Sequence, residues 1–413
     1  MRNRTLDRPL IFAACLLAGF GLITLYSAGQ TDIPTQAQGV WIRQLVWMAV
    51  GAVAAAVVFR FSFRILEWLA PAAYAFAILL LLLTLVVGTG QGTAASSKSW
   101  LSIGGHQVGQ PAELAKLAVI LMLARYLSNR REPPRSLREL LAPCLIAGVP
   151  FLLVLKQPDL GSAIVFVGIL FMMLFWAGVK PSLLFILASP GLSLLLAFNT
   201  WTWALWMVLL TILLYSWRVY VAEGIGVWVV NSVMGALAIP LWQRLAPYQQ
   251  NRLLTFLNPE VDPRAAGYHA IQSKVAIGSG GWFGNGFGEG PQKRLAFLPA
   301  QHTDFIFSVV GEELGFLGVL VALALFFALF LVLLRIARRA IDPFASLIVF
   351  GILALFFTHL FENVGMTVNL MPITGIPLPF FSYGGSFFVV CCMCLGLALR
   401  AAWDARLSGY ADM

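Results

Sequence analysis

Long apolar segments, each separated from the next by a shorter polar stretch, recur along almost the whole chain. Segments such as 76–87 and 317–334 are apolar on every side, and many are long enough to cross about 30 Å of hydrocarbon as helices. A transmembrane barrel would instead show runs of roughly ten residues that alternate in polarity. The pattern therefore predicts an all-α, polytopic transmembrane helical bundle and argues against a barrel.

Hydropathy predicts about twelve membrane spans, with errors of a few residues at their ends. They cover residues 9–28, 41–60, 65–88, 112–127, 138–155, 161–178, 181–198, 201–216, 224–243, 305–335, 343–366 and 383–401. The first segment has no small-residue cleavage site, so we expect a retained anchor and not a signal peptide. We expect one membrane domain over residues 1–413 and no soluble domain.

The basic residues indicate how the predicted bundle is oriented. If the arginine-rich N-terminus is cytoplasmic, alternation places the turns near 60–64, 125–138 and 335–339 on the same side, as the positive-inside rule requires. The polar stretches that then face outward are 89–111, 156–160, 244–304 and 367–382. Long polar segments gathered on one face are usually functional, so we expect a site there.

Composition narrows the class further. The chain is 60% hydrophobic and 11% charged, with a formal net charge of +9. Because the positive charge follows the topology rule, it does not indicate a nucleic-acid partner. The cysteines at 15, 144, 391, 392 and 394 lie in apolar segments, where they behave as small hydrophobic residues, so no metal site is firmly predicted.

Asp304 is the most informative acid in the chain. It lies where the long, glycine-rich polar segment 244–304 returns to an apolar helix beginning near Phe305. In a chain with so few charges, such an acid is either a helix cap or part of chemistry at the membrane surface.

Two further polar breaks interrupt the apolar pattern. Glu113 and Lys116 are three residues apart, on one face of an otherwise apolar helix, where charges usually face the bundle or water. They are either a functional pair or a structural ion pair. In the second break, 156–161, Asp159 is expected to cap the helix that begins near Gly161.

The outer segment 244–304 contains a glycine run at 278–290 and several basic residues. Glycines can bring backbone donors close to phosphate oxygens, but no strand precedes this run and no Gly-Lys-Ser/Thr follows, so a flexible surface loop is the default interpretation. The basic residues are either solvated charges or ligands of a pyrophosphate near the lipid headgroups. They are Arg244, Arg252, Lys274, Lys293 and Arg294.

Several motifs, in order along nearly the whole chain, make the protein resemble the SEDS family (shape, elongation, division and sporulation) of peptidoglycan glycosyltransferases. The motifs are Trp100 with Gln110-Pro-Ala-Glu-Leu-Ala-Lys116, Gln157-Pro-Asp-Leu-Gly161, Pro299-Ala-Gln-His-Thr-Asp-Phe305, Gly311-Glu-Glu-Leu-Gly315 and 374–386. Residues 258–281 resemble the RodA branch more than the FtsW branch, which favours a role in cell elongation and cell shape.

The resemblance implies that the chain polymerises lipid II into glycan strands and releases undecaprenyl pyrophosphate. The family's essential aspartate falls on Asp304, which would accept the proton of the attacking sugar hydroxyl as a general base in an inverting transfer. The motifs and the charges together indicate a set of substrate-binding residues. These are Trp100, Glu113, Lys116, Gln157, Asp159, Arg252, Gln272, Lys274, His302, Thr303 and Ser382.

The resemblance also implies a location and partners. We expect a multi-pass protein of the bacterial cytoplasmic (inner) membrane, with a cytoplasmic N-terminus and an extracytoplasmic active site. The expected partners are a class B penicillin-binding protein (a transpeptidase), lipid II, the growing glycan strand and membrane lipid. No cofactor is required by this reading, although a divalent cation (Mg or Mn) could hold the pyrophosphate.

The sequence departs from the family pattern in three places. The family usually has ten spans, and 181–242 contains enough apolar sequence for an additional transmembrane hairpin around 201–221. Ser99 precedes Trp100 where the family commonly has arginine, with Lys98 as a neighbouring charge, and the spacing from Trp100 to Glu113 is one residue longer than usual. The last two changes affect the role expected of the 89–111 loop.

Two other functions are compatible with the sequence. A lipid-linked precursor flippase or other transporter would also suit charges inside the spans, but transporters usually have two related halves with a site at the midplane, and no repeat is visible here. A non-catalytic scaffold of the cell-wall synthesis complex would require Asp304 to be only a helix cap.

Overall fold

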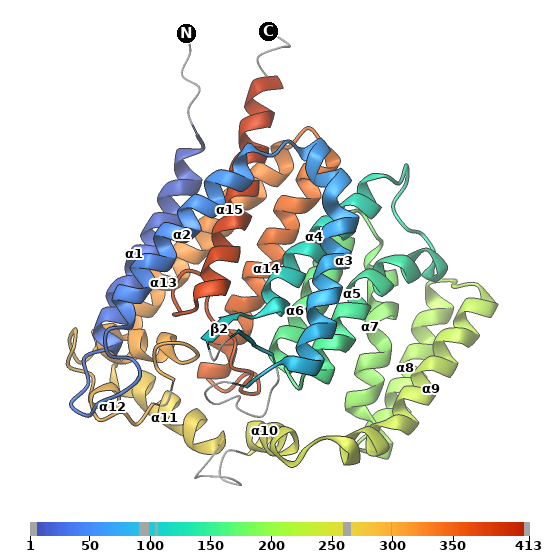
Figure 1. Ribbon diagram of the computed structural model, residues 1–413. Coiled ribbons are helices and arrows are strands. Elements are labelled where there is room, and N and C mark those ends of the chain that lie inside the picture. Colours follow the sequence, from blue (N-terminus) through green and yellow to red (C-terminus); the bar gives the residue numbers. More distant parts are fainter. Residues whose placement is uncertain (1–5, 91–98, 104–105, 259–265, 299, 409–413) are drawn as a thin grey trace.

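The computed structural model describes residues 6–90, 99–103, 106–258, 266–298 and 300–408. These form a bundle of long helices, with both ends of the chain at the same end of the bundle (Figure 1). The helices are α1 (Arg8–Ala28), α2 (Val40–Arg60), α3 (Phe63–Val87), α4 (Pro111–Ser128), α5 (Leu137–Lys156), α6 (Leu160–Trp176), α7 (Pro181–Leu196), α8 (Thr200–Ser216), α9 (Val221–Arg244), α10 (Pro247–Leu257), α11 (Ala266–Ser279), α12 (Pro291–Arg294), α13 (Ile306–Arg339), α14 (Pro343–Thr367) and α15 (Gly385–Ser408).

Each of the twelve predicted spans coincides with one of these helices to within a few residues, so the predicted helical class is confirmed. Within the described part, eight helices are long and apolar enough to cross a membrane, and α6, α7 and α8 are shorter apolar helices. The chain is therefore a multi-pass membrane protein, while the exact number of spans stays a prediction.

The bundle is organised around α14, which packs against α4, α6, α13 and α15. Most of its side chains are buried, from Phe344 near its start to Met366 near its end. On the periphery, α2 packs mainly on α15 and exposes most of its apolar side chains. In a membrane that apolar surface faces lipid, so leaving it exposed costs little free energy.

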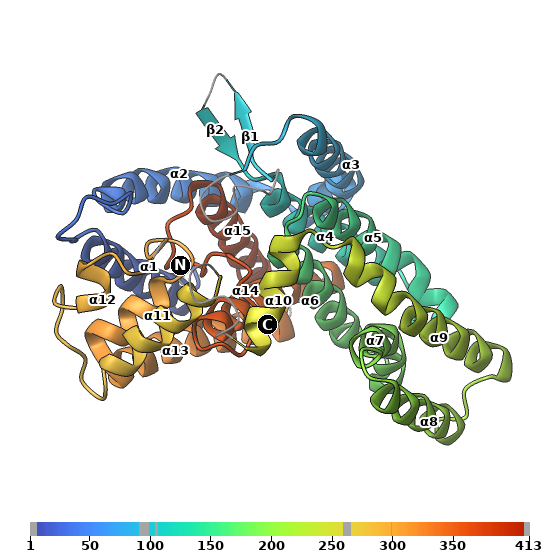
Figure 2. The same ribbon diagram turned by 90° about the horizontal axis from the view of Figure 1, so that it is seen from below.

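Helices α7, α8 and α9 form an arm beside the main bundle (Figure 2). They have a separate apolar cluster that includes Ile186, Trp206 and Leu210. Inside this arm the fully buried Asn231 donates hydrogen bonds to Ser189 Oγ and the Val227 carbonyl, each 2.9 Å long. The arm coincides with the sequence 181–242, for which we predicted an additional hairpin, and its membrane topology stays a prediction.

Two regions differ from the predicted loops. Residues 244–304, expected as one long loop, contain α10, α11 and α12. The 89–111 loop contains an antiparallel hairpin of β1 (Leu101–Ile103) and β2 (His106–Gly109), so the fold is not purely helical. Both differences place ordered backbone at the end of the bundle opposite the termini (Figure 1).

Helix α13 is 34 residues long and is kinked at Gly315, whose φ is 62° and ψ is −159°. At about 1.5 Å per residue, the part after the kink is long enough to cross a bilayer by itself. The part before the kink, from Ile306 to Leu314, is almost wholly buried beneath the outer segments. The kink therefore separates a spanning helix from a short helix that supports Asp304.

Candidate active site

Asp304 lies on a tight turn directly before α13. The backbone N–H groups of Thr303 and Asp304 both donate to the Ala300 carbonyl, at 3.1 Å each. Helix α13 has Phe305 as its N-cap residue and, among the described residues, no side chain caps it. The Asp304 side chain lines a cavity.

The Asp304 side chain lies against a neighbouring segment at a position, Gly375, where only glycine fits. Gly375 has a φ of 74°, and a Cβ atom placed there would lie 3.2 Å from Asp304 Oδ2. A larger residue would meet both a strained backbone and the carboxylate. The segment 374–377 thus lies alongside the acid and lines the same cavity.

Two buried polar side chains fix the backbone of this turn. Asn363 of α14 donates to the Asp304 carbonyl at 2.9 Å and to the Ile376 carbonyl at 2.8 Å. Ser382 donates to the Thr303 carbonyl at 2.6 Å and accepts from the Leu378 N–H at 2.8 Å. Segments that are far apart in the sequence are thereby joined around Asp304.

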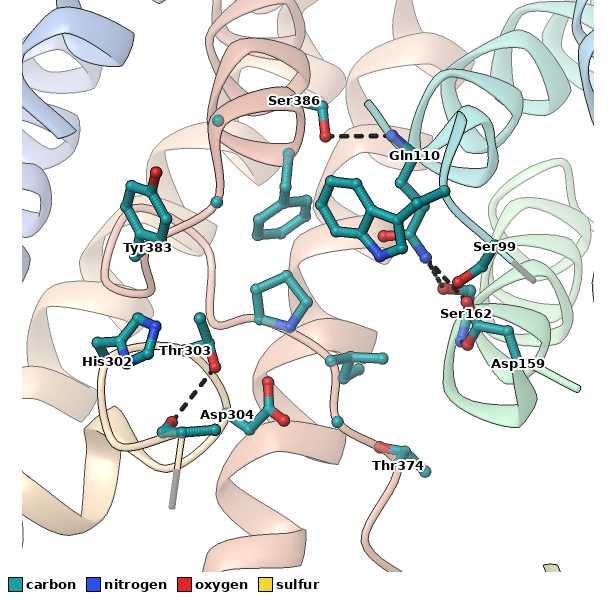
Figure 3. Close-up of a pocket in the computed structure, with 18 of the residues that line it drawn as sticks. Ser99, Gln110, Asp159, Ser162, His302, Thr303, Asp304, Thr374, Tyr383 and Ser386 are labelled. Carbon is teal, nitrogen blue, oxygen red and sulfur yellow. Dashed lines mark hydrogen bonds between the residues drawn. The ribbon is translucent and has the colours of Figure 1, made fainter. Parts of the chain in front are cut away.

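The cavity has a volume of about 560 Å³, which lies in the range of small-molecule sites. It is built from the α1–α2 loop, the end of the 89–111 loop, the start of α6, α10 and the two segments around Asp304. In Figure 3, His302 and Tyr383 lie on one side of Asp304, and Gln110, Asp159 and Ser162 lie on the other.

The wall opposite His302 is a hydrogen-bonded group of polar side chains. Asp159 caps α6 by accepting from the Ser162 N–H at 3.0 Å, which confirms the predicted capping role. Its other oxygen accepts from Gln110 Nε2 at 2.8 Å. The Gln110 N–H in turn donates to Ser386 Oγ at 3.4 Å (Figure 3). This network connects α4, α6 and α15 across the cavity wall.

Lys116 is fully buried outside the cavity lining. Its Nζ lies 2.8 Å from Glu113 Oε1 and 3.0 Å from His359 Nε2. The other His359 nitrogen, Nδ1, lies 3.0 Å from the Pro377 carbonyl. A lysine ammonium donates, so His359 Nε2 accepts and Nδ1–H donates to Pro377. The predicted Glu113–Lys116 pair is therefore present, and it supports the 374–377 segment from within the bundle.

The histidines near the cavity are electrostatically unlike ordinary histidines. Burial, and secondarily the Arg43 guanidinium, lower the pKa of His302 to about 4. Burial, and secondarily Arg252, also lower the pKa of His269 on α11. His302 is therefore a neutral imidazole at physiological pH. The His302 ring can therefore contact a ligand in the cavity without adding positive charge.

The structure separates the predicted site residues into two groups. Those that line the cavity are Trp100, Asp159, Arg252, His302, Thr303 and Asp304. Those outside the lining are Glu113, Lys116, Gln157, Gln272, Lys274 and Ser382. Among the second group, Gln157 is buried and donates to the Leu81 carbonyl at 3.0 Å, while Lys274 is exposed on α11. Gln157 thus joins the end of α5 to α3, and Ser382 supports the site through the Thr303 carbonyl.

A second buried charge pair supports the outer segment. Lys293 Nζ lies 2.5 Å from Glu313 Oε1, and Ser27 at the end of α1 donates to the same carboxylate. Glu312 accepts from the backbone N–H groups of Gln292 and Lys293, at 2.6 and 3.2 Å. The Gly311–Gly315 motif therefore fixes α12 and α1 against the first part of α13.

The glycine run packs on the kink of α13, which overturns the expectation of a flexible loop. The Asn285 and Gly286 N–H groups donate to the carbonyls of Glu312 and Glu313, and the Phe316 N–H donates to the Gly281 carbonyl. A Cβ on Gly284 would lie 2.0 Å from the Glu313 carbonyl oxygen. Glycine is needed here because two backbones approach closely.

Fold and site together define a class: a multi-pass membrane protein with a carboxylate-bearing cavity at one end of its helical bundle. Comparison with protein families gives a match to the cell cycle protein family of FtsW, RodA and SpoVE over residues 8–208 and 200–407. The chain therefore belongs to the FtsW/RodA/SpoVE (SEDS) family, as its motifs predicted.

Individual relatives match over nearly their whole length. The peptidoglycan glycosyltransferase RodA of Treponema pallidum is 35% identical, over 95% of this chain and 96% of the relative. The peptidoglycan glycosyltransferase MrdB of Escherichia coli K12 is 36% identical, over 95% and 92%.

Two solved structures resemble the whole chain. One, of a peptidoglycan synthase complex that coordinates polymerization and crosslinking, matches at a TM-score of 0.70 with 29% identity over 97% of this chain and 98% of the other. The rod shape determining protein RodA of Thermus thermophilus matches at 0.62 with 27% identity over 97% of each.

Proposed function

We propose that this protein is a peptidoglycan glycosyltransferase that polymerises lipid II. The observation that carries the proposal is the Asp304 carboxylate, which lines a cavity and is anchored through its backbone by Asn363. Relatives of similar length that are named peptidoglycan glycosyltransferases support it. A positioned carboxylate at a membrane surface suits a reaction in which a sugar hydroxyl must lose a proton.

In the proposed reaction, the 4-hydroxyl oxygen of the incoming GlcNAc forms a bond to the anomeric carbon of the MurNAc at the end of the growing strand. The bond from that carbon to the pyrophosphate oxygen breaks, and undecaprenyl pyrophosphate leaves with the electron pair. Asp304 takes the hydroxyl proton. Inversion at the anomeric carbon needs no covalent enzyme intermediate.

Arg252 is the residue we propose for the leaving pyrophosphate. It lies on α10 and lines the cavity, whereas Lys116 is buried in its pair with Glu113 and Lys274 lies outside the lining. A guanidinium can bind two phosphate oxygens at once, which favours charge developing on the leaving group. Trp100 and His302, which both line the cavity, are proposed to contact the saccharide.

A divalent cation at the pyrophosphate would depend on the substrate for most of its ligands. The described residues contain no group of three His, Cys, Asp or Glu side chains placed to hold a metal. Mg²⁺ commonly binds through one or two carboxylates together with phosphate oxygens. Among the described residues, Asp304 and Asp159 are the carboxylates that line the cavity, so they would be the protein ligands of such an ion. When bound, the ion would stabilise negative charge on the leaving group.

We further propose that the protein lies in the bacterial cytoplasmic membrane with its N-terminus inside and the cavity outside. The cavity and the chain ends lie at opposite ends of the bundle. At the terminal end, Asp7 pairs with Arg335 and Arg406, so basic side chains gather there as the positive-inside rule requires. A cysteine placed at the exposed Glu289 should react with an impermeant thiol reagent in intact spheroplasts, and protection there would contradict this orientation.

We also propose a role in cell elongation together with a class B penicillin-binding protein. The support is similarity to proteins named RodA and to a structure of a peptidoglycan synthase complex. Copurification with a single-span transpeptidase from the same genome tests the partner. Rescue of a RodA-depleted strain but not of an FtsW-depleted strain tests the role, and the reverse rescue would contradict it.

Polymer formation from purified, labelled lipid II tests the proposed activity. The full chain with its transpeptidase partner should give a ladder of glycan strands even when a β-lactam blocks crosslinking. A complex that is folded and binds its partner but makes no strands from lipid II would overturn the proposal. Transport of labelled lipid II across vesicles by the same sample would favour a flippase instead.

A further inference from the structure

Arg43 stands at the edge of the cavity and was not singled out by the sequence. It lies near the start of α2, and its guanidinium carbon is 5.7 Å from the centre of the Tyr383 ring. Tyr383 lines the cavity, its N–H donates to the His302 carbonyl at 2.9 Å, and the two rings lie 6.1 Å apart. We call this group the Arg43–Tyr383–His302 wall.

The positive charge of this wall is not neutralised by a neighbouring carboxylate. Within the described residues Arg43 is exposed and makes no ion pair, in contrast to Lys293 and Arg294 of the outer segment, which pair with acids. His302 is neutral at physiological pH and adds no charge. An arginine packed over an aromatic ring has a restricted orientation, and its planar donors suit phosphate oxygens.

Arg43 and Arg252 approach the cavity from different sides. Arg43 is on α2 and Arg252 is on α10, and α15 lies between these helices in the view of Figure 2. Arg252 belongs to the cavity lining, whereas Arg43 is outside the lining and packs over the ring of Tyr383, which is a lining residue; we call this its rim position. In the proposed orientation, the start of α2 is the outer end of a membrane span, near the level of the phosphates of membrane-anchored molecules.

We propose that Arg43 binds the pyrophosphate of the incoming lipid II molecule, as an anion-binding position distinct from Arg252. The inference rests on the proposed function, because in that reaction both substrates are lipid-anchored pyrophosphates. Only one of them breaks its bond to sugar. The rim position of Arg43 suits the pyrophosphate that does not react, while Arg252 is placed in the lining with Asp304.

Steady-state kinetics of the full chain with its partner, in nanodiscs of phosphatidylcholine, test this position. Arg43→Gln should raise KM for lipid II by about tenfold, the loss expected for a charge-assisted bond, with kcat changed less than about twofold. Arg43→Lys, which keeps the charge but not the planar donors, should fall between Arg43→Gln and wild type. Arg60→Gln is the matched control, since Arg60 is exposed at the other end of α2.

Binding provides a measurement that does not need turnover. In an Asp304→Asn background, farnesyl pyrophosphate should bind about tenfold more weakly when Arg43 is glutamine, and farnesol should show no such difference. Equal binding of farnesyl pyrophosphate by both proteins would overturn the proposal. If wild type makes no polymer, the proposed function fails and this binding measurement alone decides the role of Arg43.

The lipid composition distinguishes substrate from bulk phospholipid. If Arg43 only contacts phospholipid headgroups, Arg43→Gln will match wild type in phosphatidylcholine and differ from it only when phosphatidylglycerol is present, which would overturn the proposal. A fall in kcat without a change in KM, or an equal defect in Arg60→Gln, would also overturn it. A KM defect that is present in both lipid compositions and specific to Arg43 supports it.

Discussion

Replacing Asn363 with alanine should reduce activity much more than its effect on folding explains. The Asn363 amide is fully buried and donates to the carbonyls of Asp304 and Ile376, at 2.9 and 2.8 Å. These two bonds connect α14 to the turn that carries Asp304 and to the 374–377 segment beside it.

The size of the effect follows from the two bonds. A net intramolecular hydrogen bond contributes about 0.5–1.5 kcal/mol, and a buried carbonyl left without a donor costs about 1–3 kcal/mol. We therefore expect Asn363→Ala to lower the free energy of unfolding by about 2–4 kcal/mol. A displacement of Asp304 by about 1 Å is enough to reduce turnover about a hundredfold.

Asn231→Ala is the matched control, because Asn231 is equally buried and donates two hydrogen bonds, but within the arm α7–α9. Thermal unfolding in detergent should show comparable destabilisation of both variants. Lipid II polymerisation, measured well below both melting midpoints, should fall about a hundredfold only in Asn363→Ala. Equal activity of the two variants would refute the idea that Asn363 positions Asp304.

Three other predictions test the supporting structure. Lys293→Met leaves the Glu313 carboxylate buried without its cation, so the free energy of unfolding should fall by about 3–5 kcal/mol, and an unchanged melting midpoint would contradict the pairing. The pKa of His302 is about 4 in the folded protein, below the ordinary value of about 6.5, so the unfolded chain binds a proton more readily. The free energy of unfolding should therefore fall as the pH drops below about 6.5, by about 2 kcal/mol at pH 5. His302→Gln should remove that part of the pH dependence in melting curves. Gly281→Ala has open space for its Cβ, so it should lower the free energy of unfolding only by the backbone strain, about 1–3 kcal/mol. Gly284→Ala should lower it by more, because its Cβ also meets the Glu313 carbonyl. Similar melting midpoints of the two glycine variants would contradict the close packing.

The helices were predictable because the apolar segments are long and uninterrupted. Even where a helix is polar at one point, as at Glu113 and Lys116 in α4, the surrounding apolar residues decide its structure. The capping role of Asp159 was equally local, since the residue and the N–H that it accepts are three positions apart. Predictions that depend only on neighbouring residues were the most reliable.

The support of the site could not be read from the sequence, since it joins distant segments. The contact of Asn363 with Asp304 spans 59 positions, and that of Gln110 with Asp159 spans 49. Neither has a periodicity that would indicate it. The surroundings of Asp304 could not be predicted for the same reason, because they come from α14 and from the segment around Gly375.

One local feature of the sequence indicated a structure that was not predicted. The Gly104-Gly105 pair in the sequence is typical of a tight hairpin turn between β1 and β2, although the pair itself lies outside the described residues. Arg43 was missed because a single arginine near a helix end is usually only a topology marker. Its relation to Tyr383, 340 positions away in the chain, appears only in the folded bundle.

The most direct test of the central claim compares wild type, Asp304→Asn and Asp304→Glu in lipid II polymerisation, with equal folding and equal partner binding established first. If Asp304 is the general base, Asp304→Asn should lose about 10²–10⁴-fold in turnover, because the amide keeps the shape but cannot take the proton. Asp304→Glu should retain part of the activity. Turnover by Asp304→Asn close to that of wild type would contradict the account.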